Sequence, residues 1–258
     1  MVKRCLILGS GSSLKEGLNL KFKKRFENEI TFSINDNVKF FNSTVYTFGD
    51  WTAYASRFNL YKKQPLVIGR YDTHFTHQIE GSLPCPKHDG LILLQSSGKW
   101  NGKDSLKKGI YSPVLTGIFT LNLAIRLGFI QIFLLGFDLN STRNKTHFYE
   151  DVPGAGQYTD YEGKLCSGVG KYPSGEYKTS VYNNSDVEID NLWKPFEEEF
   201  DTVKIYNVSL DSRIQVFKKI GYNTLFKILK EFPLEINQQE AQNEIREILT
   251  PYNRLTND

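Results

Sequence analysis

The stretch Ser112–Asn140, SPVLTGIFTLNLAIRLGFIQIFLLGFDLN, decides the fold that we predict for this chain. From Leu121 to Gly128, apolar or small residues recur at positions i, i+3, i+4 and i+7, a spacing that places them on one face of a helix. Residues 129–137 are then almost continuously apolar, which is typical of a parallel strand covered on both faces. The stretch therefore predicts a helix, a glycine stop and a buried strand of an α/β sheet.

The two ends of this helix–strand unit carry the polar residues. Thr116 and Gly117 stand in a small polar turn where the helix begins, and Asp138 follows the buried strand. The N–H groups at a helix N-terminus attract anions, and α/β sheets bind ligands at the carboxyl ends of their strands. We therefore expect an anionic ligand beside these residues.

A glycine-rich turn follows the first predicted strand. Residues 3–8 form a short run that ends in Cys5-Leu6-Ile7-Leu8, and it leads into Gly9-Ser10-Gly11-Ser12-Ser13-Leu14. Glycines let the backbone approach a ligand closely, and Ser12 or Ser13 can cap the next helix or donate to a phosphate. The third glycine of the dinucleotide fingerprint is absent, because position 14 is Leu. The turn is consistent with a nucleotide site or with a plain tight turn.

Two further strands end in residues suited to the same site. Residues 30–34 lead to Asn35, and residues 45–48 lead to Gly49 and Asp50. Right-handed crossovers bring successive parallel strands back in one direction, so their carboxyl ends share one edge of the sheet. Each polar residue alone is consistent with a helix cap, but their recurrence favours a site.

The segment 140–185 is rich in Gly, Tyr, Asn, Ser and Lys and has little apolar periodicity. A connection of this length inside a compact domain usually forms a lid or a binding loop. It contains Thr146-His147-Phe148-Tyr149-Glu150-Asp151, in which His147 lies beside acidic and phenolic groups. We interpret His147 as a candidate general base, with an ordinary surface histidine as the alternative.

These elements predict a doubly wound α/β fold with a mostly parallel sheet and helices on both faces. The domains expected are a Rossmann-like nucleotide-binding domain over 1–217, which includes the lid at 140–185, and a C-terminal helical extension over 218–258. Residues 237–249 are strongly polar. We expect them to pack on the outside of the fold or against another subunit of a homo-oligomer.

Composition limits the remaining classes of function. A net charge of +3 over 258 residues gives no strong nucleic-acid signal, and no apolar run approaches the length of a membrane span. The chain has three cysteines, whose spacing fits neither a disulfide framework nor a metal clamp. The sequence starts directly with a strand and shows no signal peptide. We therefore expect a cytoplasmic protein without a metal site.

In its order of motifs the chain resembles the bacterial sialyltransferases of glycosyltransferase family 42 and the related 6-hydroxymethylpterin diphosphokinase-like proteins. The matching elements are Leu6–Lys15 for the family's strand and GxGxSL turn, Asn35 for its second-strand Asn, Leu115-Thr116-Gly117 for the turn before the central helix, Gly136-Phe137-Asp138 for the G-(I/F)-D strand end, and Ile205–Ser212 for the late strand and its serine. The family commonly has Asn where Ser10 stands. Its pair of tyrosines after the G-(I/F)-D strand has no aligned counterpart here, and Asn140 follows Phe137-Asp138-Leu139.

The resemblance implies a Rossmann-like, GT-A-like variant that holds a nucleotide at the strand ends. With the residues above, it gives two sets of candidates. The catalytic candidates are His147, Tyr149 and Asp138. The nucleotide-binding candidates are Gly9, Ser10, Gly11, Ser12, Asn35, Asp50, Thr116, Gly117 and Ser212.

Three functions remain open from the sequence. The first is a glycosyltransferase that moves a sugar from a nucleotide-sugar donor, such as a CMP-sugar, to an acceptor hydroxyl without a required cofactor. The second is a pyrophosphokinase that uses ATP and Mg²⁺, with Asp138, Asp50 and Asp151 as oxygen ligands. The third is a non-catalytic nucleotide-binding protein whose tyrosine-rich lid stacks on a sugar or base.

Overall fold

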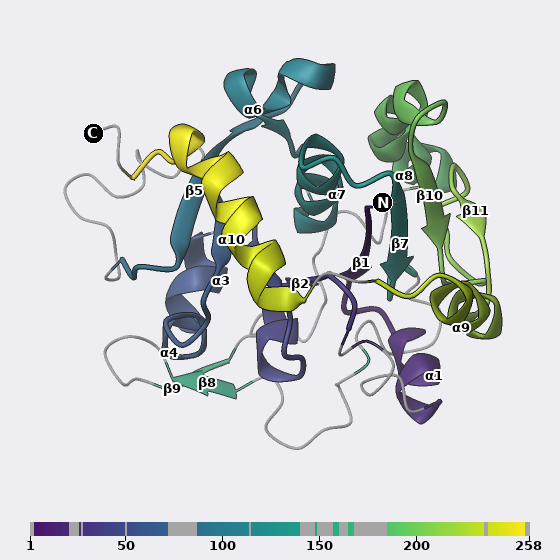
Figure 1. Ribbon diagram of the computed structural model, residues 1–258, viewed down its shortest axis with the longest axis horizontal. Helices are drawn as coiled ribbons and strands as arrows, with labels where there is room; N and C mark the ends of the chain where they lie inside the picture. The colour runs from purple at the N-terminus through teal and green to yellow at the C-terminus, as the bar shows by residue number, and fades with distance from the viewer. Residues whose placement is uncertain are drawn as a thin grey trace.

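The computed structural model describes residues 3–20, 26, 28–49, 51–71, 87–113, 115–139, 148, 157–159, 165–167, 185–234 and 237–255. Within these residues, nine strands form one sheet in which every neighbouring pair is parallel. The strand order is β11-β10-β7-β1-β2-β3-β4-β5-β6. The predicted fold class, a doubly wound α/β fold with a parallel sheet, is confirmed (Figure 1).

The strands are short, as in most α/β domains. They are β1 (Arg4–Leu8), β2 (Thr31–Ile34), β3 (Val45–Phe48), β4 (Val67–Tyr71), β5 (Leu91–Ser97), β6 (Ile110–Tyr111), β7 (Gln131–Leu135), β10 (Lys204–Asn207) and β11 (Lys218–Lys219). A separate antiparallel pair, β8 (Gln157–Thr159) and β9 (Leu165–Ser167), falls inside the segment predicted as a lid. The rest of that segment, apart from Phe148 and Ser185, lies outside the described residues.

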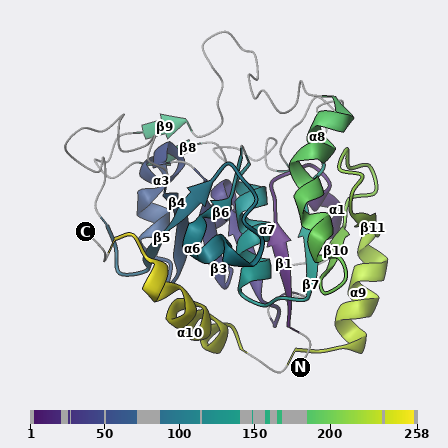
Figure 2. The same ribbon diagram turned by 90° about the horizontal axis from the view of Figure 1, so that it is seen from above.

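Helices cover both faces of the sheet (Figure 2). They are α1 (Leu14–Asn19), α3 (Trp51–Ser56), α4 (Phe58–Tyr61), α6 (Ser105–Lys108), α7 (Thr116–Arg126), α8 (Asp186–Trp193), α9 (Tyr222–Glu231) and α10 (Gln238–Leu249), with 3₁₀ turns η1 (Asn35–Lys39), η2 (Gly102–Asp104), η3 (Lys194–Glu199) and η4 (Thr250–Tyr252). One face packs against α7, α8 and α10, and the other against α1, α3, α4 and α9. Among the described residues, no helix has the length and apolar character that crossing a bilayer requires.

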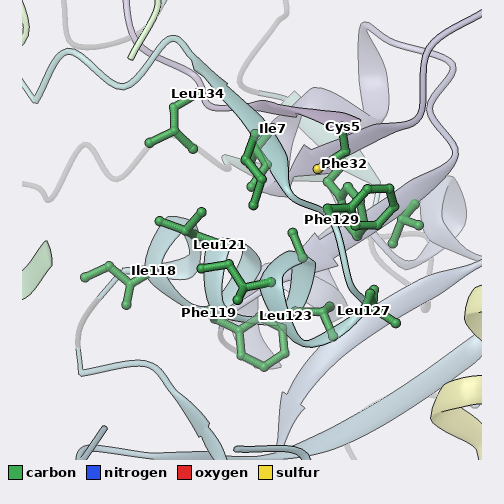
Figure 3. Close-up of a cluster of buried hydrophobic side chains, with 14 of the residues drawn as sticks. Cys5, Ile7, Phe32, Ile118, Phe119, Leu121, Leu123, Leu127, Phe129 and Leu134 are labelled. Atoms are coloured by element: carbon green, nitrogen blue, oxygen red, sulfur yellow. The ribbon is translucent and has the colours of Figure 1, made fainter. Parts of the chain in front are cut away.

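The unit α7–β7 lies at the centre of the fold, as its sequence predicted. Helix α7 ends at Arg126, Gly128 adopts a left-handed φ of 83°, and β7 pairs with both β1 and β10. Figure 3 shows Ile118 and Leu121 of α7 facing Ile7 and the end of β7. Every residue from Gly117 to Ile125 is buried, so α7 is enclosed on all sides rather than amphipathic.

The sheet continues past residue 217, where the sequence placed the start of the helical extension. Lys218 and Lys219 form β11, which pairs with β10. Helix α9 then packs Leu225 and Leu229 into the cluster that contains Leu6 and Phe133 of the sheet. The C-terminal part therefore shares the core of the sheet, because its apolar residues bury against β1 and β7.

Helix α10 runs along the amino-terminal edge of the sheet (Figure 2). Its polar residues bond to the segments that enter successive strands: Gln238 donates to Glu29 O, Gln242 to Thr44 O, and Arg246 to both Pro65 O and Asp89 O. Its apolar residues Ala241, Ile245 and Leu249 are buried in the core of the α7 face. The polar composition that suggested an outer helix reflects this set of bonds to strand entrances.

Leu249→Ala tests whether α10 is part of the cooperative core. Leu249 is fully buried, so we expect a loss of about 2–5 kcal/mol in the free energy of unfolding, measured by urea denaturation. Glu247→Ala, on the exposed side of the same helix, is the matched control and should change stability by less than about 0.5 kcal/mol. A separate early transition of α10, with the main transition unchanged, would show that the helix is an independent appendage.

Candidate functional site

The connections place a topological switch point between β1 and β7. The chain leaves β1 toward β2 and the strands beyond it, whereas it leaves β7 toward β10 and β11 on the other side. The carboxyl ends of the two strands are in register, with Leu8 opposite Leu135. In open parallel sheets this is the point at which ligands bind, because the two loops diverge there.

At this point the glycine turn after β1 lies directly on the turn after β7. Gly9 N donates to Leu135 O over 2.7 Å, and Gly11 N donates to Gly136 O over 2.8 Å. A Cβ on Gly9 would lie 2.6 Å from Gly136 O. The close approach that these glycines permit is therefore between two segments of the chain, and not the approach to a ligand that their sequence suggested.

Asp138 holds this contact together. Its carboxylate, in a residue that is only 5% exposed, accepts hydrogen bonds from Ser12 Oγ at 3.2 Å, from Ser13 N at 2.6 Å and from Ser13 Oγ. The donors that the sequence offered for a phosphate are thus used by a carboxylate of the same chain. This geometry gives Asp138 and Ser12 a role in positioning the β1–α1 turn.

Gly11→Ala tests this packing. Its Cβ would meet Gly136 O at 2.6 Å and Asp138 Oδ2 at 2.7 Å, so we expect a loss of about 1–3 kcal/mol in the free energy of unfolding. Gly98→Ala is the matched control, because no atom lies within 4 Å of the Cβ it would add. Equal thermal stability of the two variants would contradict the predicted contact.

A second group of residues gathers at the ends of β2 and β3. Asn35 Nδ2 donates to Thr116 Oγ1 over 3.4 Å, and Thr116 is the first residue of α7. A Cβ on Gly49, at the end of β3, would lie 2.2 Å from the same Oγ1. The structure thus brings together Asn35, Thr116 and Gly49, which are far apart in the sequence. Asp50, the candidate that follows Gly49, lies outside the described residues.

The start of α7 is a site with anion-attracting character. Its N-cap residue, Leu115, provides no side-chain cap. The first N–H groups of a helix have no partner within the helix, and the helix dipole adds partial positive charge there. Thr116 and Gly117 carry the first of these N–H groups. Beside them, Gly117 packs against Phe137, since a Cβ on Gly117 would lie 2.5 Å from its ring.

Asn35 has two features that are common at binding sites. Its φ of 47° lies in the left-handed region, which is uncommon for residues other than glycine. Its Oδ1 is buried and has no hydrogen-bond partner within the described part of the chain. The hydroxyl of Tyr61 donates to Asn35 O over 3.1 Å and helps to hold this conformation. An acceptor atom is thus held at the end of β2, next to the α7 N-terminus.

Replacing Asn35 separates the strain from the side chain. Glycine adopts a left-handed φ freely whereas alanine does not, so Asn35→Gly should be about 1 kcal/mol more stable than Asn35→Ala in urea denaturation. The two variants lack the same amide and differ by one methyl group. If they unfold at the same urea concentration, the left-handed backbone at position 35 does not store strain.

The residues after Asn35 connect the two groups. Asn37, fully buried, donates from Nδ2 to Leu8 O and Gly9 O, and Ser10 Oγ donates to its Oδ1 over 3.5 Å. Asp36 forms a buried ion pair with Arg57. The roles of Asn37 and Arg57 were not predicted from the sequence, although the run Asn35-Asp36-Asn37 indicates that polar groups cluster at this strand end.

Ser212, predicted to bind nucleotide, is 2% exposed and fully engaged within the fold. Its Oγ donates to Phe137 O over 2.6 Å and accepts from Asn207 Nδ2 and Ile214 N. The next residue, Arg213, donates from its backbone N to Asp138 O. These bonds fix the turn after β7 from the side of β10, which is a structural role.

Tyr222 of α9 lies near Asp138 and was not identified from the sequence. Burial, together with the negative charges of Asp138 and Glu16, raises the pKa of its phenol well above the usual range. The phenol therefore stays neutral at physiological pH. It contributes a buried, uncharged polar group to the cluster that holds α9 against the sheet.

Two predicted catalytic residues, His147 and Tyr149, lie outside the described residues. Phe148, which stands between them in the sequence, is described and is 5% exposed. Its backbone N donates to Ser10 O over 2.9 Å, and its ring packs against Phe40 and Phe41. The roles of His147 and Tyr149 remain predictions.

No protein-family model and no curated protein sequence matches the chain. A search of solved structures found the sialyltransferase CstII from Campylobacter jejuni, studied in complex with the substrate analogue CMP-3FNeuAc. The two chains are 14% identical, the match covers 86% of each, and the TM-score is 0.43. Values this low carry no argument about chemistry.

Proposed function

We propose that this chain is a glycosyltransferase that uses a nucleotide-sugar donor and places the nucleotide at the carboxyl ends of β1, β2 and β3. The observation that carries the proposal is Asn35, which has a left-handed backbone beside the N-terminus of α7 and whose Oδ1 has no hydrogen-bond partner among the described residues. A residue held in this way supplies an acceptor for a hydroxyl or amino group, and the helix end supplies donors for a phosphate.

The chemistry proposed is transfer of a sugar to an acceptor hydroxyl, with a nucleotide as the leaving group. Negative charge develops on the leaving phosphate as its bond to the sugar breaks. The donors suited to stabilise that charge are the N–H groups of Thr116 and Gly117 and the hydroxyl of Thr116. Each can stabilise it by about 3 kcal/mol. No cofactor is required for this step in the proposal.

The acceptor hydroxyl needs a base. We assign this role to His147 and assign Tyr149 to a hydrogen bond with the leaving phosphate, following the sequence prediction. Asn35 and Ser10 would position the nucleotide. Ser10 is itself held by its hydrogen bond to Asn37. Asp138 would act indirectly, because its oxygens already accept from Ser12 and Ser13 and so order the turn after β1.

The alternative, a pyrophosphokinase dependent on Mg²⁺, places Asp138 among the metal ligands. Three hydrogen bonds to that carboxylate disfavour this role, since the ion would have to compete with them. Asp50 and Asp151, the other two metal ligands of this alternative, lie outside the described residues. The third function, nucleotide binding without turnover, uses the same Asn35 site and differs only in the outcome of an assay.

Thermal-shift measurements with CMP, UDP, GDP and ATP, with and without Mg²⁺, test the proposal. We expect one nucleotide without Mg²⁺ to raise the melting temperature, because a ligand that binds the native state stabilises it. Asn35→Gly should lower the affinity for that nucleotide about tenfold or more, since it removes hydrogen bonds worth about 1 kcal/mol each without straining the backbone. Asn243→Ala, exposed on α10, is the control and should bind normally.

The same panel distinguishes the three functions. Release of the nucleotide from its sugar, lost in His147→Ala, supports the glycosyltransferase. Turnover of ATP only with Mg²⁺ supports the kinase and contradicts the proposal, and binding without turnover of any nucleotide-sugar supports the non-catalytic protein. If no nucleotide binds, the carboxyl edge is not a nucleotide site.

A further inference from the structure

A pocket lies at the edge of the sheet opposite the site proposed above, between α10 and the turn that joins α7 to β7. Its volume is about 250 Å³. Apolar side chains form most of its wall, and they come from Ile30, Leu127, Phe129, Leu234, Ile245 and Ile248. This amino-terminal edge is remote from the carboxyl ends of the strands, so the pocket is separate from the site proposed above.

The pocket opens to solvent, but most of its wall belongs to the core. Ile30, Leu127, Phe129 and Ile245 are each no more than 6% exposed, so the wall is part of the core. A wall of this kind favours the hydrocarbon part of a ligand, because burying apolar surface is favourable.

One ion pair stands at the opening. Lys3 and Glu244 both line the pocket, and their side chains form a salt bridge while remaining 47% and 43% exposed. The other cation in the wall, Arg4, is committed to a buried ion pair with Glu29. Lys3 is therefore the cation that a ligand can reach, and an exposed ion pair is weak enough to be exchanged.

We propose that this pocket binds the chain of a free medium-chain fatty acid, with its carboxylate at Lys3 in place of Glu244. The apolar wall accounts for the hydrocarbon chain, and the exposed lysine at the opening accounts for the anionic head. A bound hydrocarbon chain would contact both α10 and the α7–β7 turn, which form opposite walls of the pocket. The proposal is independent of the function assigned to the carboxyl edge.

Calorimetry and thermal shift with hexanoate, octanoate and decanoate, below their micelle concentrations, test the binding. We expect saturable binding to the full chain, with affinity rising about fourfold per added methylene until the pocket is filled. At tenfold excess over the Kd, the melting temperature should rise by about 3–5 °C. Absence of any saturable shift across the series would overturn the proposal.

Variants at the opening test the head group. Lys3→Met should bind octanoate only as tightly as the unmodified protein binds octanol. Glu244→Gln should bind octanoate more tightly, because it removes the competing carboxylate. Lys108→Met is the matched control, because Lys108 forms a similarly exposed pair with Asp104 away from the pocket. Equal octanoate affinity in all these variants would overturn the role of Lys3.

Variants that fill the pocket test its location. Ala241→Val and Ile248→Phe add carbon atoms to two lining residues, and each should abolish octanoate binding. If one of them fails to fold, the other and the Lys3 and Glu244 variants still decide the matter. Unchanged octanoate binding in a folded filling variant would show that the ligand binds elsewhere. A concentration-dependent dimer that the filling variant abolishes would assign the pocket to a subunit interface instead.

Discussion

The arrangement of the strand ends depends on hydrogen bonds between one carboxylate and the turn that precedes α1. Asp138, at the end of β7, accepts hydrogen bonds from Ser12 and Ser13 in the turn after β1. The two turns leave the sheet in opposite directions, and this carboxylate adds side-chain hydrogen bonds to the backbone bonds that Gly9 and Gly11 donate across the same contact. Because Asp138 is buried, the interaction is little weakened by solvent, and it fixes the geometry at the switch point.

Around that bond the polar groups divide into two kinds. The first kind forms hydrogen bonds to other residues of the chain and keeps the strand ends in place, as Ser12, Ser212 and Asn37 do. Asn35 and the first residues of α7 are less fully used, because Asn35 Oδ1 lacks a partner in the described part of the chain and no side chain caps the helix. A rigid scaffold that presents incompletely satisfied groups is what a binding site requires. This division is the physical basis for the function proposed here.

Much of the fold was predictable because it depends on local pattern. The apolar run of residues 129–137 predicted a strand covered on both faces, and the helix before it was predicted from the spacing of its apolar residues and from Gly128. The two-residue strand β11 was missed, because Lys218 and Lys219 have no apolar pattern and pair only through their backbones. The polar helix α10 was placed outside the core, since composition does not reveal hydrogen bonds to strand entrances.

The sequence by itself determined a parallel α/β sheet and the polar residues that end its strands, since both follow from periodicity along the chain. Only the tertiary structure decided how those residues are used. Ser12 and Asp138, and likewise Asn35 and Thr116, are separated by many residues, and whether each polar atom meets a chain partner depends on distances of a few tenths of an ångström. The order of residues along a chain does not contain such distances until the strands have paired and the loops have packed.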